Sequence, residues 1–262
     1  MTQALKSKPR FVTETLDLVI PLALGLALAV LVRTLAFQPF TIPSSSMSPG
    51  LLTGDYILVS KFPYGWSRAS LPLGRPQGQE RLLGRAPERG EVVVFRLPRD
   101  PSQVWIKRVI GLPGDQVEIH AGQIILNGQP VSQSAPRACL DADQPNRPVL
   151  ARIERLDTGR AYTTYDGGPD QAGDTMAPLV VPQGHYFMMG DNRDNSIDSR
   201  WPTAHGIGLL PASHIVGRAE GVAWSWQAGA SLFRPWTWVR LRSERFLLPL
   251  NRPPSALETH QD

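Results

Sequence analysis

The sequence predicts a mostly β protein: an antiparallel β-sheet or barrel-like domain with an inserted β-rich subdomain, preceded by one transmembrane α-helix. Three observations support this fold class. The 262 residues include 25 prolines and 23 glycines, which indicates many turns. Short runs of valine, isoleucine and aromatic residues lie between those turns. One long uncharged apolar run lies near the N-terminus.

The N-terminal apolar run predicts a membrane anchor. Residues 18–32 carry no charge, and with the flanking residues out to 16 and 40 the run reaches the roughly 20 residues that a spanning helix needs. The bulky, charged stretch "RTLAFQPF" follows it, where a cleavable signal would have a small-x-small site. We therefore expect an uncleaved, single-pass anchor. Lys6, Lys8 and Arg10 precede the span and only Arg33 follows closely, which predicts a cytoplasmic N-terminus.

Charge and cysteine content narrow the partners. The net charge is only +4, and basic residues near both ends flank apolar or aromatic stretches. A phospholipid bilayer is therefore a better partner than nucleic acid. Cys139 is the only cysteine, so an intramolecular disulfide is impossible. The five histidines lack ligand spacing, and no P-loop, GxSxG or HExxH motif is present, so we expect no metal and no cofactor.

Six segments after the anchor are typical of strands because β-branched and aromatic residues dominate them. They are residues 55–62, 91–97, 104–112, 116–131, 185–190 and 214–226. Within 116–131, Ala121–Gly122 and Asn127–Gly128 predict tight turns between consecutive strands. The Gly-, Arg- and Pro-rich residues 66–89 predict a surface loop.

These patterns divide the chain into five parts. They are a cytoplasmic N-terminus and anchor (1–36), the first part of the β domain (37–131), an inserted subdomain (132–181), the second part of the β domain (182–226) and a membrane-proximal C-terminal segment (227–262). The C-terminal region interleaves tryptophans with arginines. Two interpretations of it stay open: ordinary packing on the core, or docking of the rings at lipid headgroup depth.

The stretch "TIPSSSMSPG" places three serines directly after the anchor. One interpretation is a hinge, since Ser, Pro and Gly are common in loops. The other is a nucleophile near the membrane surface. If the serines are extended, as the flanking prolines favour, Ser44 and Ser46 point the same way and Ser45 points away. One hydroxyl could then attack while the other donates to a developing oxyanion.

The strand segment "WIKRVIGL" places Lys107 beside Arg108. Successive side chains on a strand point to opposite faces, so one of the two is buried if one face is core. A buried lysine loses its charge readily and can act as a general base, whereas arginine cannot. The alternative is a surface Lys–Arg pair on an edge strand.

The segment "GDNRDNSIDSR" has the composition of a turn. It could also support a lysine base, with Asp198 and Arg200 as an ion pair and Ser196 as a hydroxyl that orients the amine. These residues alone do not decide between the two interpretations.

Together, "PSSSMSPGLLTGDYILVSKFPYG", "GEVVVF", "WIKRVIGLPGD" and "GDNRDNSIDSR" resemble, in order and wording, segments of the bacterial type I signal peptidases, which are membrane-anchored Ser–Lys proteases. The resemblance covers most of residues 40–220. It implies that Ser46 is the nucleophile and Lys107 the general base, and that the Ser44 hydroxyl and the Ser46 backbone N–H form the oxyanion hole. It also implies that Ser196, Asp198 and Arg200 support the lysine.

The resemblance further implies the function: removal of N-terminal signal peptides from secretory preproteins, with cleavage after small-x-small motifs. The enzyme would lie in the bacterial inner membrane with its catalytic domain on the periplasmic side, and would need no metal. Small subsites are expected from aliphatic side chains near two strands, namely Ser60, Val92, Val93, Val94 and Phe95.

Some features depart from the family pattern. The stretch "WPTAHGIGLLPASHIVG" is a few residues longer than is common, residues 132–181 lack a cysteine pair, and Gly50 stands where Thr is common. Two other functions stay open as hypotheses. One is a Ser–Lys peptidase dedicated to a single secretion or conjugation system, and the other is an inactive membrane-tethered binding protein.

Overall fold

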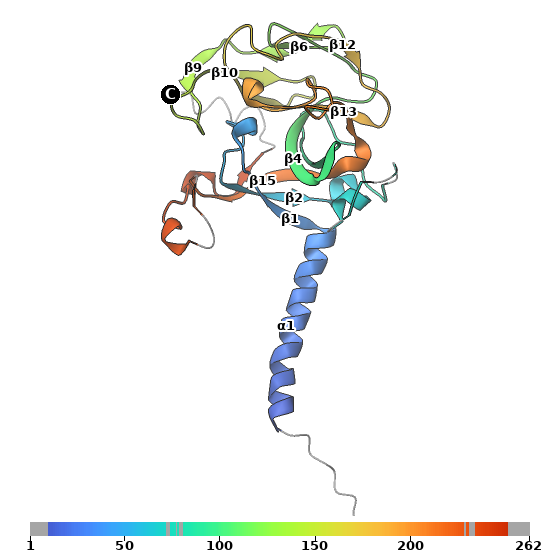
Figure 1. The fold of residues 1–262 in the computed structure, drawn as a ribbon, viewed down its shortest axis with the longest axis vertical. Coiled ribbons are helices and arrows are strands. Elements are labelled where there is room, and N and C mark those ends of the chain that lie inside the picture. The colour runs from blue at the N-terminus through green and yellow to red at the C-terminus, as the bar shows by residue number, and fades with distance from the viewer. Residues whose placement is uncertain are drawn as a thin grey trace, which may run out of the picture.

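The computed structural model describes residues 10–71, 74–76, 78, 81–227, 229–230 and 234–250. Helix α1 (Arg10–Leu35) stands away from a β-rich body (Figure 1). Its 19 residues from Asp17 to Leu35 have a mean hydropathy of 2.3, and none of that segment is buried. Among the described residues this is one helix that is long and apolar enough to cross a bilayer. At 1.5 Å per residue the whole helix is about 39 Å long.

The largest sheet has eight antiparallel strands in the order β1-β2-β15-β3-β4-β13-β14, with β16 paired to β15. The strands are β1 (Phe37–Thr41), β2 (Asp55–Ser60), β3 (Val92–Leu97), β4 (Asp100–Gly111), β13 (His185–Met189), β14 (Leu210–Pro211), β15 (Ile215–Ser225) and β16 (Leu248–Pro249). The fold class is therefore confirmed: the described chain is mostly antiparallel β, preceded by one apolar helix.

Two smaller antiparallel sheets complete the body. One holds β8 (Ser132–Gln133), β9 (Arg137–Leu140), β10 (Pro148–Arg155) and β11 (Ala161–Asp166). The other holds β5 (Gln116–His120), β6 (Gln123–Leu126), β7 (Gln129–Pro130) and β12 (Met176–Val180). Ala121 and Asn127 adopt φ of 49° and 52°, as the predicted tight turns require. Because β12 pairs with β5, the end of segment 132–181 shares a sheet with segment 37–131.

Short 3-10 helices fill the connections. They are η1 (Ser45–Met47), η2 (Phe62–Tyr64), η3 (Arg68–Ser70), η4 (Arg193–Asn195), η5 (Ala212–His214), η6 (Pro235–Thr237) and η7 (Ser243–Arg245). All six expected strand segments contain strands, and β1, β14 and β16 are additional strands outside those segments and the inserted subdomain.

Strand β3 lies in the middle of the largest sheet, and both of its faces are covered. Val92 and Val94 pack in one hydrophobic cluster, while Val93 and Phe95 pack in another. Apolar residues therefore follow one another along β3 without the alternation of a half-exposed strand. Met47 belongs to the first of these clusters, so the three-serine segment is attached directly to the core.

The C-terminal segment packs on the loop that follows the three serines. Arg245 pairs with the fully buried carboxylate of Asp55, with Nη2 2.5 Å from Oδ2, and also donates to the backbone oxygen of Gly50 at 3.0 Å. In the same segment Trp236 is 73% exposed and Val239 is 87% exposed. Part of this region therefore packs on the body, as the first interpretation expected, and part exposes large apolar side chains.

One buried carboxylate, that of Glu91 directly before β3, connects three other segments of the chain. Glu91 is fully buried and accepts hydrogen bonds from Arg85 Nη2 at 2.5 Å, Tyr64 Oη at 2.8 Å and Arg218 Nη1 at 3.1 Å. Burial alone would raise the pKa of Glu91, but these hydrogen bonds and one from the Glu88 backbone lower the pKa to about 2.

The Glu91 cluster predicts acid sensitivity. The folded-state pKa lies below the ordinary value of 4.5, so ionised Glu91 contributes stability that is present above about pH 4.5 and is lost as the pH falls toward 2. We expect Glu91→Gln to be less stable than wild type at pH 6, with the difference shrinking as the pH approaches 2. Urea unfolding midpoints between pH 2 and 6 measure this, and an equal difference at every pH would contradict it.

Candidate active site

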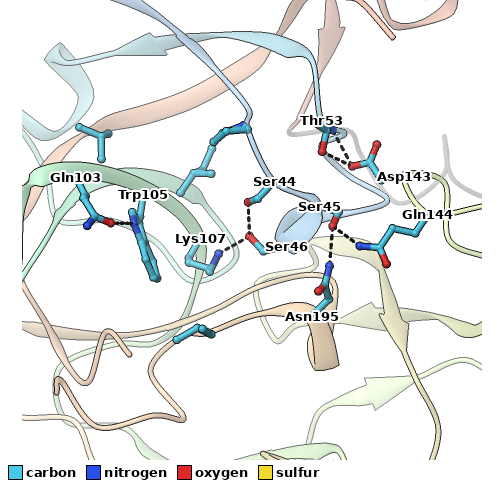
Figure 2. A pocket seen from close by; sticks show the side chains of 14 residues that line it. Ser44, Ser45, Ser46, Thr53, Gln103, Trp105, Lys107, Asp143, Gln144 and Asn195 are labelled. Carbon is cyan, nitrogen blue, oxygen red and sulfur yellow. Dashed lines mark hydrogen bonds between the residues drawn. The ribbon is translucent and has the colours of Figure 1, made fainter. Parts of the chain in front are cut away.

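The three serines are not in one extended segment. Ser44 is extended, with φ −141° and ψ 155°, and the chain then enters the 3-10 helix η1. The oxygens of Ser44 and Ser46 nevertheless face each other at 3.5 Å, while Ser45 points to the other side (Figure 2). The Ser45 hydroxyl is held by Gln144 Nε2 at 3.1 Å and Asn195 Nδ2 at 2.6 Å. The expected orientation is thus present, but a helical turn produces it.

Lys107 lies beside Ser46, on strand β4. Its Nζ is 2.6 Å from the Ser46 Oγ, and its side chain is only 3% exposed (Figure 2). Burial lowers the pKa of Lys107 to about 8, while the carboxylates of Asp198 and Asp191 oppose this and Arg200 adds to it. At neutral pH part of the Lys107 population is therefore uncharged. Across the 2.6 Å contact, the Ser46 hydroxyl can donate its hydrogen to the neutral amine.

Arg108, the next residue on β4, is buried as well. It donates to Asp191 through Nε at 2.8 Å and Nη2 at 2.6 Å, and its guanidinium lies 3.9 Å from the centre of the Tyr162 ring. On a strand with one core face, only one of Lys107 and Arg108 needs to be buried. Both are, because the side of the sheet that Arg108 faces is covered by the inserted subdomain, to which Tyr162 on β11 belongs.

The expected ion pair is present near Lys107. Arg200 Nε lies 2.9 Å from Asp198 Oδ1, and Asp198 Oδ2 also accepts from the Gly190 backbone at 3.0 Å. Ser196 behaves differently from the expectation. Its hydroxyl is buried and makes no hydrogen bond within the described part of the chain, so it does not bond to the Lys107 amine here.

Gly190 is a site residue that the sequence analysis did not single out. A Cβ there would lie 2.3 Å from the Ser196 Oγ and 2.5 Å from the Ser46 backbone oxygen. Such contacts are far too short, so only glycine lets the turn after β13 pack against the serine segment. The backbone N–H of Asn192 donates to the Ser46 oxygen at 3.2 Å, which holds that contact.

The inserted subdomain also reaches the serine segment. Asp143 Oδ2 accepts hydrogen bonds from Ser48 Oγ at 3.1 Å and from the Thr53 backbone and hydroxyl at 2.7 and 3.0 Å. Asp141 accepts from Asn192 Nδ2 at 2.8 Å. These residues were not predicted because Asp143 lies 95 positions after Ser48, and the run "DADQPNR" has the local composition of an ordinary polar turn.

A pocket of about 730 Å³ opens beside Ser46 and Lys107. Its lining comes from four segments: Pro43, Ser44, Ser45, Ser46 and Thr53; Gln103, Val104, Trp105, Ile106 and Lys107; Asp143 and Gln144; and Asn195 and Ile197. Apolar side chains of β4 lie on the Lys107 side, and Thr53, Asp143 and Gln144 lie on the opposite side of Ser46 (Figure 2).

The residues expected to form small subsites are not among those that line this pocket. Ser60, Val92, Val93, Val94 and Phe95 are all at most 1% exposed. The four apolar residues belong to the two clusters on either side of β3, and the Ser60 hydroxyl bonds to Glu220. The apolar residues that do line the pocket are Val104, Trp105, Ile106 and Ile197.

Comparison with known proteins gives first the class of enzyme, a serine endopeptidase. A sequence model described as "Signal peptidase, peptidase S26" matches residues 15–224. Signal peptidase I of Rickettsia typhi is 35% identical over 209 residues, covering 76% of each chain, and that of Rickettsia canadensis is 35% identical over 212 residues, covering 78% of this chain and 77% of the relative. This protein belongs to the signal peptidase family, peptidase S26, which confirms the resemblance.

A solved structure of a signal peptidase I from Enterococcus faecalis V583 is also similar in sequence. It is 26% identical, and the match covers 51% of this chain and 97% of that one, with a TM-score of 0.31.

The surroundings of Lys107 predict how the reactivity of Ser46 depends on pH. Reaction with a serine-directed acylating reagent should rise about tenfold per pH unit below pH 8 and level off above it, since the neutral amine is the base. Arg200→Met should shift the midpoint upward, because it leaves Asp198 unopposed. Asp198→Asn should shift it downward. Inactivation rates between pH 6 and 10 measure both, and shifts in the same direction would contradict this account.

The contacts of Asp143 predict that the insertion holds the serine segment in place. Asp143→Ala removes the acceptor of three hydrogen bonds, and a displacement of about 1 Å at a reacting group can cost about 100-fold in rate. We expect acylation of Ser46 to slow at least about tenfold. Asp170→Ala, at an exposed aspartate of the same insertion, is the matched control and should react like wild type. Equal rates for the two variants would show that Asp143 has no such role.

Proposed function

We propose that this signal peptidase cleaves preproteins through an acyl-enzyme, with Ser46 as nucleophile and Lys107 as general base. One observation carries the proposal: the 2.6 Å contact between the Ser46 hydroxyl and a buried amine whose pKa is lowered to about 8. A serine hydroxyl becomes a nucleophile only when a base takes its proton, and a neutral lysine within hydrogen-bond reach can do so.

Acylation begins when the neutral Lys107 amine accepts the Ser46 proton and Oγ attacks the carbonyl carbon at the cleavage site. The developing oxyanion accepts hydrogen bonds from the Ser44 hydroxyl, 3.5 Å from Ser46 Oγ, and from the Ser46 backbone N–H. Each such donor is worth about 2.7–4 kcal/mol. Protonated Lys107 then gives its proton to the leaving nitrogen, the C–N bond breaks, and the signal peptide stays as an ester on Ser46.

Deacylation uses the same base. Lys107, neutral again, takes a proton from a water molecule, whose oxygen attacks the ester carbonyl. The proton then passes from Lys107 to Ser46 Oγ as the C–O bond breaks, which restores both groups. Asp198 and Asp191, whose charges act on the lysine, are paired with Arg200 and Arg108, so that little net charge is left beside it.

The specificity for small-x-small motifs is assigned to the apolar wall of the pocket. In an extended substrate, the residues one and three positions before the cut point to the same side. Val104 and Ile106 on β4, with Ile197, line the pocket next to Lys107. Because these aliphatic side chains are bulky, they leave room only for small substrate side chains. This is the preference expected at these two positions.

The bilayer is proposed as the second partner. Helix α1 would be the single-pass anchor, with a cytoplasmic N-terminus and the β body on the periplasmic side of a bacterial inner membrane. Residues 234–250, drawn in red, lie at the end of the body from which α1 departs (Figure 1). Large apolar side chains are exposed there, namely Trp236, Trp238, Val239, Leu241, Phe246 and Leu247. Confinement to one membrane would raise the effective concentration of enzyme and substrate.

Cleavage assays test the proposed roles. Ser46→Ala and Lys107→Ala should each lower preprotein cleavage by at least about 1,000-fold, since nucleophile and base act as a unit. Ser132→Ala is the matched control, because Ser132 lies in the insertion and is exposed. Ser45→Ala is a poorer control, since it leaves the Gln144 and Asn195 amides without their acceptor. Undiminished cleavage by Lys107→Ala would refute the mechanism.

A further inference from the structure

A second buried lysine lies at the junction between α1 and the β body. Lys61, just after β2, is fully buried, and the proposed mechanism does not use it. Its Nζ donates to three backbone oxygens: Arg33 at 3.0 Å, Thr34 at 3.2 Å and Ser70 at 2.5 Å. An ammonium has three hydrogens, so all of its donors are used.

These contacts complete the C-terminal end of α1. The last four carbonyls of a helix have no partner inside it and carry its negative dipole end. Here Val32 O accepts from the Ala36 backbone at 2.8 Å, Lys61 covers the next two oxygens, and Trp66 Nε1 donates to Leu35 O at 2.9 Å. All four carbonyls of the last turn are therefore satisfied, three of them by side chains of the body.

The junction has no flexible linker. Helix α1 ends at Leu35 and β1 begins at Phe37, so only Ala36 lies between them. The Lys61 backbone N–H donates to the Ala36 oxygen at 3.0 Å. Strand β1 then pairs with β2 along its whole length, and Ser44 follows three residues after its end. The direction of the helix is thus tied to the sheet that carries the serine segment.

Burying a charged lysine at this position is unfavourable in free energy. Burial, with help from Arg33 and Arg96, lowers the pKa of Lys61 to about 8, so the charged form is held at a cost. An apolar side chain of similar length would pack there without that cost. The compensation is the set of bonds to α1 and η3, which an apolar residue could not make.

We propose that Lys61 and Trp66 form an anchor clamp that holds the pocket at a fixed height above the bilayer, so that the enzyme selects cleavage sites by their distance from the membrane. This inference rests on the proposed function, because it assumes that Ser46 cuts substrates that are themselves inserted in the bilayer. Lys61 and Trp66 are positioning residues, and neither lines the pocket beside Ser46.

The test compares membrane-inserted and soluble substrates. Full-length enzyme in proteoliposomes is given preproteins with one cleavage site and an apolar segment lengthened or shortened by single leucines, and also a soluble peptide with the same site. We expect wild type to show a narrow optimum in segment length. Lys61→Met and Trp66→Phe should broaden that optimum and lower the peak rate at least threefold, with the peptide rate unchanged within twofold.

Arg81→Met is the matched control. Arg81 also donates to backbone oxygens, those of Tyr64, Gly65, Ala212 and Ile215, and none of these lies in α1. Its loss should leave the width of the optimum unchanged. If both clamp variants keep the wild-type width of the optimum in segment length, the inference is overturned. An equal loss of cleavage rate on the peptide and the preproteins overturns it too, because it would show a role in folding alone. If wild type cleaves neither substrate, the proposed function itself fails and the inference falls with it.

Discussion

The exclusion of water from the Lys107 amine is the constraint on which the rest of the site depends. Burial favours the neutral amine, but Asp191 and Asp198 lie close enough to favour the charged one. Each carboxylate is therefore paired, Asp191 with Arg108 and Asp198 with Arg200. Arg200 opposes the effect of Asp198 on the lysine, and the inserted subdomain covers the side of β4 that carries the Asp191–Arg108 pair. The two ion pairs act as a supporting frame whose net charge is close to zero.

The fold could be predicted because its signals are local, whereas the pairing of Ser46 with Lys107 was implied by the resemblance to a family. Runs of valine and isoleucine between glycine turns indicate strands, and the apolar run before them indicates the helix. The opposite orientations of Lys107 and Arg108 follow from strand geometry alone. The orientation of Ser44 and Ser46 was predicted from an extended segment and is produced by η1 instead. Ser44 itself is extended at the start of η1, and Met47, directly after Ser46, is buried in a core cluster at the end of that turn.

The rest of the site depends on contacts between distant segments, which no local pattern reports. Val92 to Phe95 have the composition of a strand near the site, but composition does not reveal that both faces of β3 are covered. Asp143 and Gln144 belong to a polar turn whose partners lie more than 85 positions earlier. Gly190 is one glycine among 23, and only the close approach of Ser46 and Ser196 distinguishes it.

The bond from Arg245 to Asp55 and Gly50 has a consequence for how the protein matures. Residues 234–250 are the last described part of the chain to be synthesised, yet they brace the loop that begins directly after the serines. A nascent chain that lacks them has a buried carboxylate without its cation, which is costly in free energy. The loop after the serines therefore gains this support only once residues 234–250 have been synthesised, and a chain truncated before them would carry the Asp55 carboxylate without its cation.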